Sequence, residues 1–233
     1  IVADATTETD IEQIILAINK SEKKFLPAGT AAGAKVFSKY WLSGIKKEDV
    51  CVNTGKLPRL IISGTATKIT ARQIAKLEAC GNSDMNFIPL TDDDILNGVS
   101  EDLVDKILIN LRNNISVCIH TSGIIANFDG FSDNSLNAEL TKDKFVAKIT
   151  DYLAELTKQI MAQIEVILIT LGGETSYKCC KAINSNELRV IDEVAPAISF
   201  CMDINNRRII TKSGNLGNSN TLIDILNYLK QHE

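Results

Sequence analysis

The sequence is poor in the residues on which several common kinds of site depend. Of its 233 residues only two are histidine, and none of its six cysteines belongs to a C-x-x-C pair. A histidine-rich metal centre and a zinc ribbon are therefore excluded. No apolar run approaches the roughly 18 residues of a membrane-spanning helix. With 25 basic and 29 acidic side chains and no basic stripe, the chain also lacks the charge pattern of a dedicated nucleic-acid binder.

Three familiar motifs are absent as well. The chain contains no G-x-x-x-x-G-K-[ST] phosphate loop and no G-x-S-x-G elbow, and no G-x-G-x-x-G follows its first predicted strand. These absences argue against a Walker-type nucleotidase, a serine hydrolase and a conventional dinucleotide-binding fold. Cys118 and Cys201 lie inside apolar runs, which is typical of reduced, packed thiols in a cytoplasmic protein.

What the sequence does contain is an alternation of short apolar runs and longer amphipathic segments. Apolar runs at 60–62, 86–88, 117–119 and 166–169 predict strands, and the segments between them carry apolar residues at helical spacing. The last of these runs is apolar on both faces, as in a strand covered on both sides. The pattern predicts a three-layer α/β fold with a mostly parallel or mixed sheet covered by helices.

Further predicted strands lie in the C-terminal part of the chain. Strands are expected near 188–191, 199–202 and 208–210, and Asn205 and Asn206 are expected to turn the last pair as a hairpin. A closing amphipathic helix follows. The acidic run at residues 92–94 is interpreted as a solvated loop.

The first 58 residues differ in character from the rest. Residues 1–5 resemble a buried strand that begins without Met, so we expect an upstream segment, and residues 25–26 predict a second short strand. Residues 44–58 are polar and aperiodic, as in a linker. We therefore divide the chain into the end of a preceding α/β domain at 1–48, a linker at 49–58 and a second domain at 59–233.

Three turns share one design, in which an apolar strand ends, small residues follow and a helix begins. They are SGTAT at 63–67, GGET at 172–175 and TKSGNLG at 211–217. In parallel sheets, ligands bind at the carboxyl ends of the strands, where a helix N-terminus offers free N–H groups and partial positive charge. Such turns also serve as plain helix caps or tight connections, and Lys212 would then be a solvated lysine. Gathered at one edge of a sheet, they would form a single anion-binding site.

Other candidate residues are weaker. His120 ends a strand and would face the same cleft, but a lone histidine without an identified partner is more often structural. Cys179 and Cys180 are adjacent in a predicted helix, where neighbours face different directions, so we do not expect them to share a metal.

The order and spacing of three segments resemble the four-carbon acid sugar kinase family, long catalogued as a domain of unknown function. LIISGTAT at 60–67, followed by Thr70 and Gln73, is similar to the family's SGSxSxxTxxQI turn. ITLGGETS at 169–176 is similar to its TGGETS segment, and KSGNLG at 212–217 is similar to its KSGxFG segment. Residues 1–48 resemble the end of the family's sugar-acid-binding domain.

This resemblance implies a cytoplasmic, ATP-dependent kinase of a sugar acid such as threonate, erythronate or an oxo-tetronate, with ATP and Mg²⁺ at the three turns. Gly172, Gly173 and Gly214 would contact phosphate through their backbone. Threonine hydroxyls would add contacts, Glu174 and Thr175 would bind ribose or metal-associated water, and Lys212 would balance charge. The implied nucleotide-binding residues are Ser63, Thr65, Thr67, Gly172, Gly173, Glu174, Thr175, Lys212, Gly214 and Gly217.

Two departures from the family pattern limit what is implied. The acidic DDxTGA-type motif of the N-terminal half, which helps to bind the substrate and to supply the base, is absent. We therefore expect a downstream part of a longer protein and assign neither a catalytic residue nor a metal ligand. The family's APGVP stretch reads APAIS at 195–199, so the sugar-facing turn is expected to differ.

Two further hypotheses stay open at this point. One is a non-catalytic nucleotide-sensing or interaction module of the same fold, and the other is a sugar-phosphate-binding protein that uses the same anion sites. Under the kinase hypothesis the partners are ATP and a small sugar acid, with no nucleic acid and no membrane. A homo-oligomer is compatible with all three hypotheses.

Overall fold

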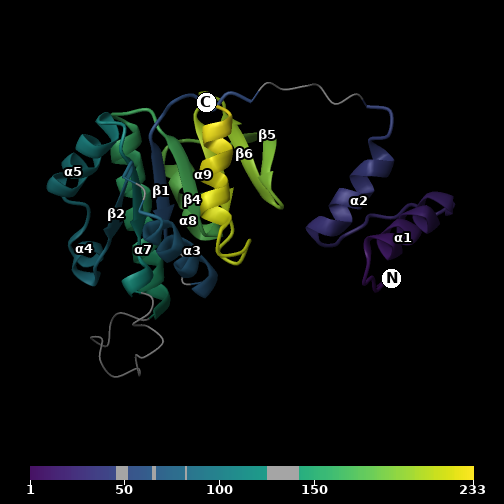
Figure 1. The fold of residues 1–233 in the computed structure, drawn as a ribbon. Coiled ribbons are helices and arrows are strands. Elements are labelled where there is room, and N and C mark those ends of the chain that lie inside the picture. The colour runs from purple at the N-terminus through teal and green to yellow at the C-terminus, as the bar shows by residue number, and fades with distance from the viewer. Residues whose placement is uncertain (46–51, 65–66, 82, 125–141) are drawn as a thin grey trace. The chain divides into compact units, whose positions relative to one another are not determined.

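The chain divides into two compact units, Ile1–Val50 and Cys51–Glu233, in the computed structural model shown in Figure 1. The structure describes residues 1–45, 52–64, 67–81, 83–124 and 142–233. The linker predicted at 49–58 lies partly outside these ranges, and so does the long polar loop that the sequence leads us to expect at roughly 121–140.

The first unit consists of two helices, α1 (Glu8–Lys20) and α2 (Ala31–Trp41). A capping box begins α1: the Thr7 hydroxyl accepts a hydrogen bond from the backbone N–H of Asp10, and the Asp10 carboxylate accepts one from the N–H of Thr7. The strands predicted at 1–5 and 25–26 are wrong. These residues have no strand partner in the described part of the unit, and Ile1 and Leu26 are exposed.

The second unit holds a seven-stranded sheet in the order β2-β3-β1-β4-β7-β6-β5. Its strands are β1 (Arg59–Ser63), β2 (Met85–Pro89), β3 (Ser116–His120), β4 (Ile167–Leu171), β5 (Leu188–Ala195), β6 (Ile198–Asp203) and β7 (Arg208–Lys212). Its described helices are α3 (Lys68–Ala79), α4 (Asp92–Asn97), α5 (Glu101–Arg112), α7 (Lys142–Met161), α8 (Gly173–Ala182) and α9 (Thr221–Gln231). The first five strands in the sheet order pair in parallel, and β6 and β5 are added antiparallel. The predicted mixed sheet is confirmed.

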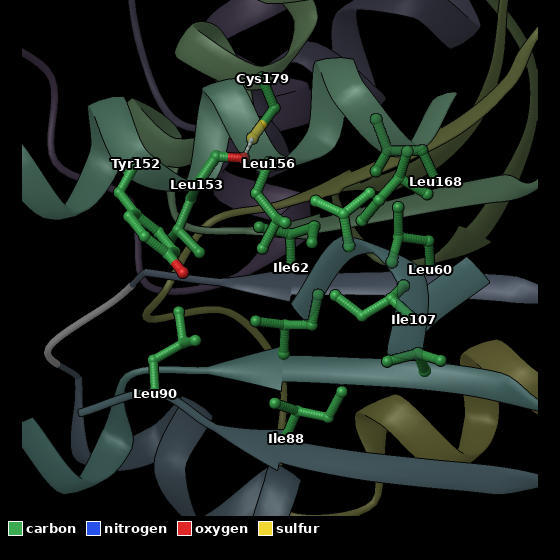
Figure 2. Close-up of a cluster of buried hydrophobic side chains, with 14 of the residues drawn as sticks. Leu60, Ile62, Ile88, Leu90, Ile107, Tyr152, Leu153, Leu156, Leu168 and Cys179 are labelled. Atoms are coloured by element: carbon green, nitrogen blue, oxygen red, sulfur yellow. Dashed lines mark hydrogen bonds between the residues drawn. The ribbon is translucent and has the colours of Figure 1, made fainter. Parts of the chain in front are cut away.

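Successive side chains along each strand point to opposite faces of this sheet, and the core is therefore divided between the two faces. In β1, Leu60 and Ile62 join the core under α5, α7 and α8, whereas Ile61 joins the core under α3 and α9. Figure 2 shows Leu153 and Leu156 of α7 directed at the first of these faces. Because both faces are covered, the central strands are apolar on both sides, as their sequence predicts. The result is a three-layer α/β/α unit (Figure 1).

The acidic run at residues 92–94 corrects another prediction, because it is the first turn of α4 and not a loop. The Thr91 hydroxyl accepts a hydrogen bond from the Asp94 N–H at 3.2 Å, and the Asp94 carboxylate accepts one from the Thr91 N–H at 2.7 Å. Carboxylates in a first turn also favour the positive end of the helix dipole. The acids therefore begin a helix.

The predicted hairpin between β6 and β7 is confirmed. The two strands pair antiparallel, and Asn206 in their turn has a φ of 59°, a conformation that asparagine tolerates better than most residues. The longest described helix is α7, with 20 residues, and one of its faces packs in the core. In the described parts of the chain, no helix combines the length and the apolar character that crossing a membrane requires.

Candidate functional site

The carboxyl ends of three neighbouring parallel strands lie side by side at one edge of the sheet. β1, β4 and β7 are consecutive in the sheet, Ser63 is in register with Leu171, and Leu171 is in register with Lys212. The three predicted turns therefore leave the sheet at the same level, about 4.8 Å apart from strand to strand.

Contacts join the three turns to one another. The Thr67 and Thr70 hydroxyls donate to the Gly214 carbonyl at 2.6 and 2.8 Å, which connects the first turn with the third. The Gly172 N–H donates to the Lys212 carbonyl at 2.8 Å, which connects the second with the third. The first and second turns also meet, because a Cβ added at Gly64 would lie 2.7 Å from the Thr175 hydroxyl oxygen.

The second turn holds an open helix N-terminus. Gly172 caps α8 with a φ of 113°, a value that L side chains rarely adopt, and its carbonyl accepts bonds from the N–H and the hydroxyl of Ser176. Gly173 is exposed, and a Cβ added there would meet nothing within 4 Å. Glu174 is exposed, whereas Thr175 is buried. The space at Gly173 therefore gives a ligand access to the positive end of α8.

The third turn contains a buried lysine. Lys212 is 1% exposed, and its ammonium group donates to the Ser213 carbonyl at 2.9 Å and to the Thr70 hydroxyl at 3.3 Å. Burial lowers the pKa of Lys212 to about 8, and no described carboxylate forms an ion pair with it. A buried cation is costly without an anionic partner, so this side chain favours the approach of an anion.

Gln73, which belongs to the first of the three segments that resemble the family, holds the third turn. Its side-chain amide donates to the carbonyls of Leu216 at 3.1 Å and Asn218 at 2.7 Å. A sequence signal existed, because Thr70 and Gln73 share the buried face of α3 with Ile74 and Leu77. Polar side chains on the buried face of an amphipathic helix indicate hydrogen bonds to a neighbouring segment.

A pocket of about 550 Å³ lies beside α8 and the end of β7. Gly173 and Lys212 line it, together with residues that the sequence analysis did not select, among them Tyr177, Lys181 and Leu188. None of the described residues that line it is acidic, and two are lysines. The pocket therefore suits a ligand that carries negative charge.

The other predicted residues that the structure describes do not line this pocket. Ser63 is buried, and its carbonyl accepts a bond from the Thr121 N–H at 3.2 Å. Thr67 caps α3 and holds Gly214, while Gly217 turns the chain ahead of α9 with a φ of +81°. Thr65 lies outside the described residues.

His120 ends β3 in register with Ser63, at the same edge of the sheet. Its ring nitrogen Nδ1 lies 2.7 Å from the Ser122 hydroxyl oxygen, and burial lowers its pKa. His120 does not line the pocket. His120 therefore lies at the same edge of the sheet as the site, but the side-chain contact described for it is with Ser122, two residues along the chain.

Known proteins share sequence similarity with this chain. A family model described as the nucleotide-binding C-terminal domain matches residues 60–222. The D-threonate kinase of Salmonella typhimurium is 23% identical over 243 residues, which cover 99% of this chain and 54% of that protein. The chain thus spans about half the length of this curated relative.

Solved structures show the same fold. A Haemophilus influenzae protein of the DUF1537 family matches with a TM-score of 0.72 at 18% identity, over 97% of this chain and 52% of that one. A Bordetella bronchiseptica DUF1537 protein, a domain-swapped dimer with bound citrate, matches with a TM-score of 0.54 at 14% identity, over 99% and 53%. Taken with the family model and the curated relative, these matches show that the chain belongs to the four-carbon acid sugar kinase family and holds its C-terminal nucleotide-binding portion.

Proposed function

We propose that this chain binds Mg-ATP at the joined turns and forms the nucleotide-binding part of a kinase that phosphorylates a four-carbon acid sugar. One observation carries the proposal. Three turns from adjacent strands meet around a buried lysine that has no carboxylate partner among the described residues, beside a pocket whose described lining contains no acid. The similarity to a D-threonate kinase supports the reaction class and the sugar-acid substrate.

The described residues fit a nucleotide. A volume of about 550 Å³ lies within the usual range of small-molecule sites, about 300–1,000 Å³. Phosphates would lie against the backbone at Gly173, where a side chain is absent and the helix N-terminus is open. Lys212 would balance their charge. Thr67, whose hydroxyl bonds the Gly214 carbonyl, would act by holding that turn in place.

Magnesium would be held mainly by the nucleotide itself. No group of three or more potential ligand side chains forms a metal site among the described residues. Mg²⁺ commonly keeps several waters and binds through one or two carboxylates and the substrate phosphates. Glu174, exposed in the first turn of α8, is the carboxylate that we propose for this contact or for the ribose hydroxyls.

The chemistry that the bound ATP supplies is a transferable phosphoryl group. The protein's part in such a transfer is to position the reactants and to neutralise charge, and the turns with Lys212 provide both for the nucleotide. No catalytic residue is assigned within the described part of this chain. The chain spans about half the length of its curated relative. The binding of the sugar acid, the hydroxyl that is phosphorylated and the catalytic base are therefore proposals for the whole protein.

Thermal unfolding of this chain with and without Mg-ATP tests the proposal. Ligand at about a hundred times its dissociation constant should add about 2.7 kcal/mol to the free energy of unfolding. For a protein of this size each kcal/mol raises Tm by about 2–4 °C. Phosphate at the same concentration should add much less. Unchanged Tm at millimolar Mg-ATP would contradict nucleotide binding, and turnover of threonate would distinguish a kinase from a sensing module.

The pH dependence of binding offers a prediction about Lys212. Its ammonium group is charged below pH 8, so Mg-ATP affinity should be highest there and should fall up to about tenfold per pH unit above pH 8. The free energy of unfolding of the unliganded protein should change in the opposite sense. In the unfolded chain the lysine has a pKa near 10.4, so between pH 8 and 10 the unfolded state binds more protons than the folded state. The contribution of Lys212 to stability therefore rises with pH in this range. Calorimetric titrations at several pH values measure the affinity. Lys212→Met should bind more weakly and without this slope, and an unchanged slope would refute the assignment.

A further inference from the structure

The pocket runs along one face of α8. Five of its lining residues, Gly173, Ser176, Tyr177, Cys180 and Lys181, come from this helix at intervals of three and four residues, which places them on one side. From Gly173 to Lys181 the helix rises by about 12 Å, at about 1.5 Å per residue. The pocket therefore has one end at the N-terminus of α8 and another toward its C-terminus.

The chemistry of the lining changes along this length. At the N-terminal end, Gly173 offers open backbone at the start of α8, and the buried Lys212, whose ammonium donates to Thr70 and Ser213, also belongs to the lining. At the other end, the pocket is lined by the exposed Tyr177, the buried Cys180 and the half-buried Leu188, together with the polar residues Lys181, Ser185 and Asn186. The first end, at the open N-terminus of α8, suits phosphate. The second end combines an aromatic and an apolar side chain with the polar side chains of Ser185 and Asn186, a combination that suits a nucleobase.

Tyr177 presents its ring to the solvent at this second end. The residue is 60% exposed, and the Lys181 ammonium lies 5.7 Å from the centre of its ring. Such a cation restrains the ring and leaves it available for stacking. Aromatic side chains in this situation are the usual platforms on which nucleobases stack.

We propose that the ring of Tyr177 and the side chains of Cys180 and Leu188 form the base subsite of the pocket, where a purine stacks while its phosphates lie at Gly173 and Lys212. This inference rests on the proposed function, because it assigns the orientation of the same nucleotide. It predicts that the base contributes to affinity through the ring of Tyr177 and independently of the phosphate end.

The test compares two ligands, Mg-ATP and Mg-tripolyphosphate, by calorimetric titration of the wild type and two variants. Tyr177→Ala removes the ring, and Tyr177→Phe keeps it. Tyr177→Ala should bind Mg-ATP about tenfold or more weakly and Mg-tripolyphosphate unchanged, since stacking on one aromatic ring is worth about that factor. Tyr177→Phe should match the wild type with both ligands.

Three results would refute the base subsite. If Tyr177→Ala binds Mg-ATP as tightly as the wild type, or loses both ligands equally, the base subsite is refuted and the phosphate site stands. If the wild type binds tripolyphosphate as tightly as ATP, no base subsite exists. If the wild type binds neither ligand, the proposed function itself fails, and the base subsite fails with it.

Discussion

Gly173→Asp should abolish Mg-ATP binding and leave the unliganded protein at least as stable as before. A Cβ at this position meets nothing within 4 Å, so the new side chain has room. An acid in the first turn of α8 also favours the helix dipole by about 0.3–1 kcal/mol. The same carboxylate would face the bound phosphates. Two unit charges about 4 Å apart repel by about 4 kcal/mol at an effective dielectric constant of about 20, close to a thousandfold in affinity.

The matched control for this variant is Gly173→Asn, which has nearly the same size and no charge. Calorimetric titration with Mg-ATP and thermal unfolding without ligand should be measured for both variants. Asparagine should retain most of the affinity that aspartate removes. Equal affinities for the two variants would show that the negative charge at Gly173 is not near the bound phosphates, and the proposed location of the phosphates would then be wrong.

Gly217→Ala should lower the free energy of unfolding by about 2–4 kcal/mol. Gly217 has a φ of +81°, and a Cβ there would lie 2.1 Å from the Thr221 hydroxyl oxygen. That hydroxyl accepts a bond from the Asn218 N–H at 2.9 Å and lies in the first turn of α9. The left-handed conformation costs about 1 kcal/mol for alanine, and the overpacking adds about 1–3 kcal/mol. Because the third turn would shift, Mg-ATP affinity should fall as well.

Gly81→Ala separates these two contributions. Gly81 also has a positive φ, +63°, but a Cβ there would meet nothing within 4 Å. Denaturant unfolding should show a loss of about 1 kcal/mol for Gly81→Ala with unchanged Mg-ATP affinity. If the two alanine variants lose the same stability, the contact with Thr221 does not constrain the third turn.

The amino-acid sequence alone predicts the elements of the second unit and the class of its fold. Continuous apolar runs such as 166–169 predict strands covered on both sides, and helical spacing predicts the helices between them. Local pattern was insufficient in the first unit and at residues 92–94. A strand requires a partner, which the described part of residues 1–45 does not provide, and a capping box at Thr91 converts an acidic run into a helix.

The three turns could also be recognised in the sequence, because small residues between a strand and a helix are a local signal. Their assembly could not. The strand order β1-β4-β7, the bonds from Thr67 and Thr70 to Gly214 and the burial of Lys212 join segments that are distant in the chain. Tyr177 and Leu188 carry no local motif and line the pocket only because α8 packs beside the end of the sheet. Local periodicity thus determined the elements and their turns, whereas long-range pairing and packing decided which residues share a site and which charge is buried there.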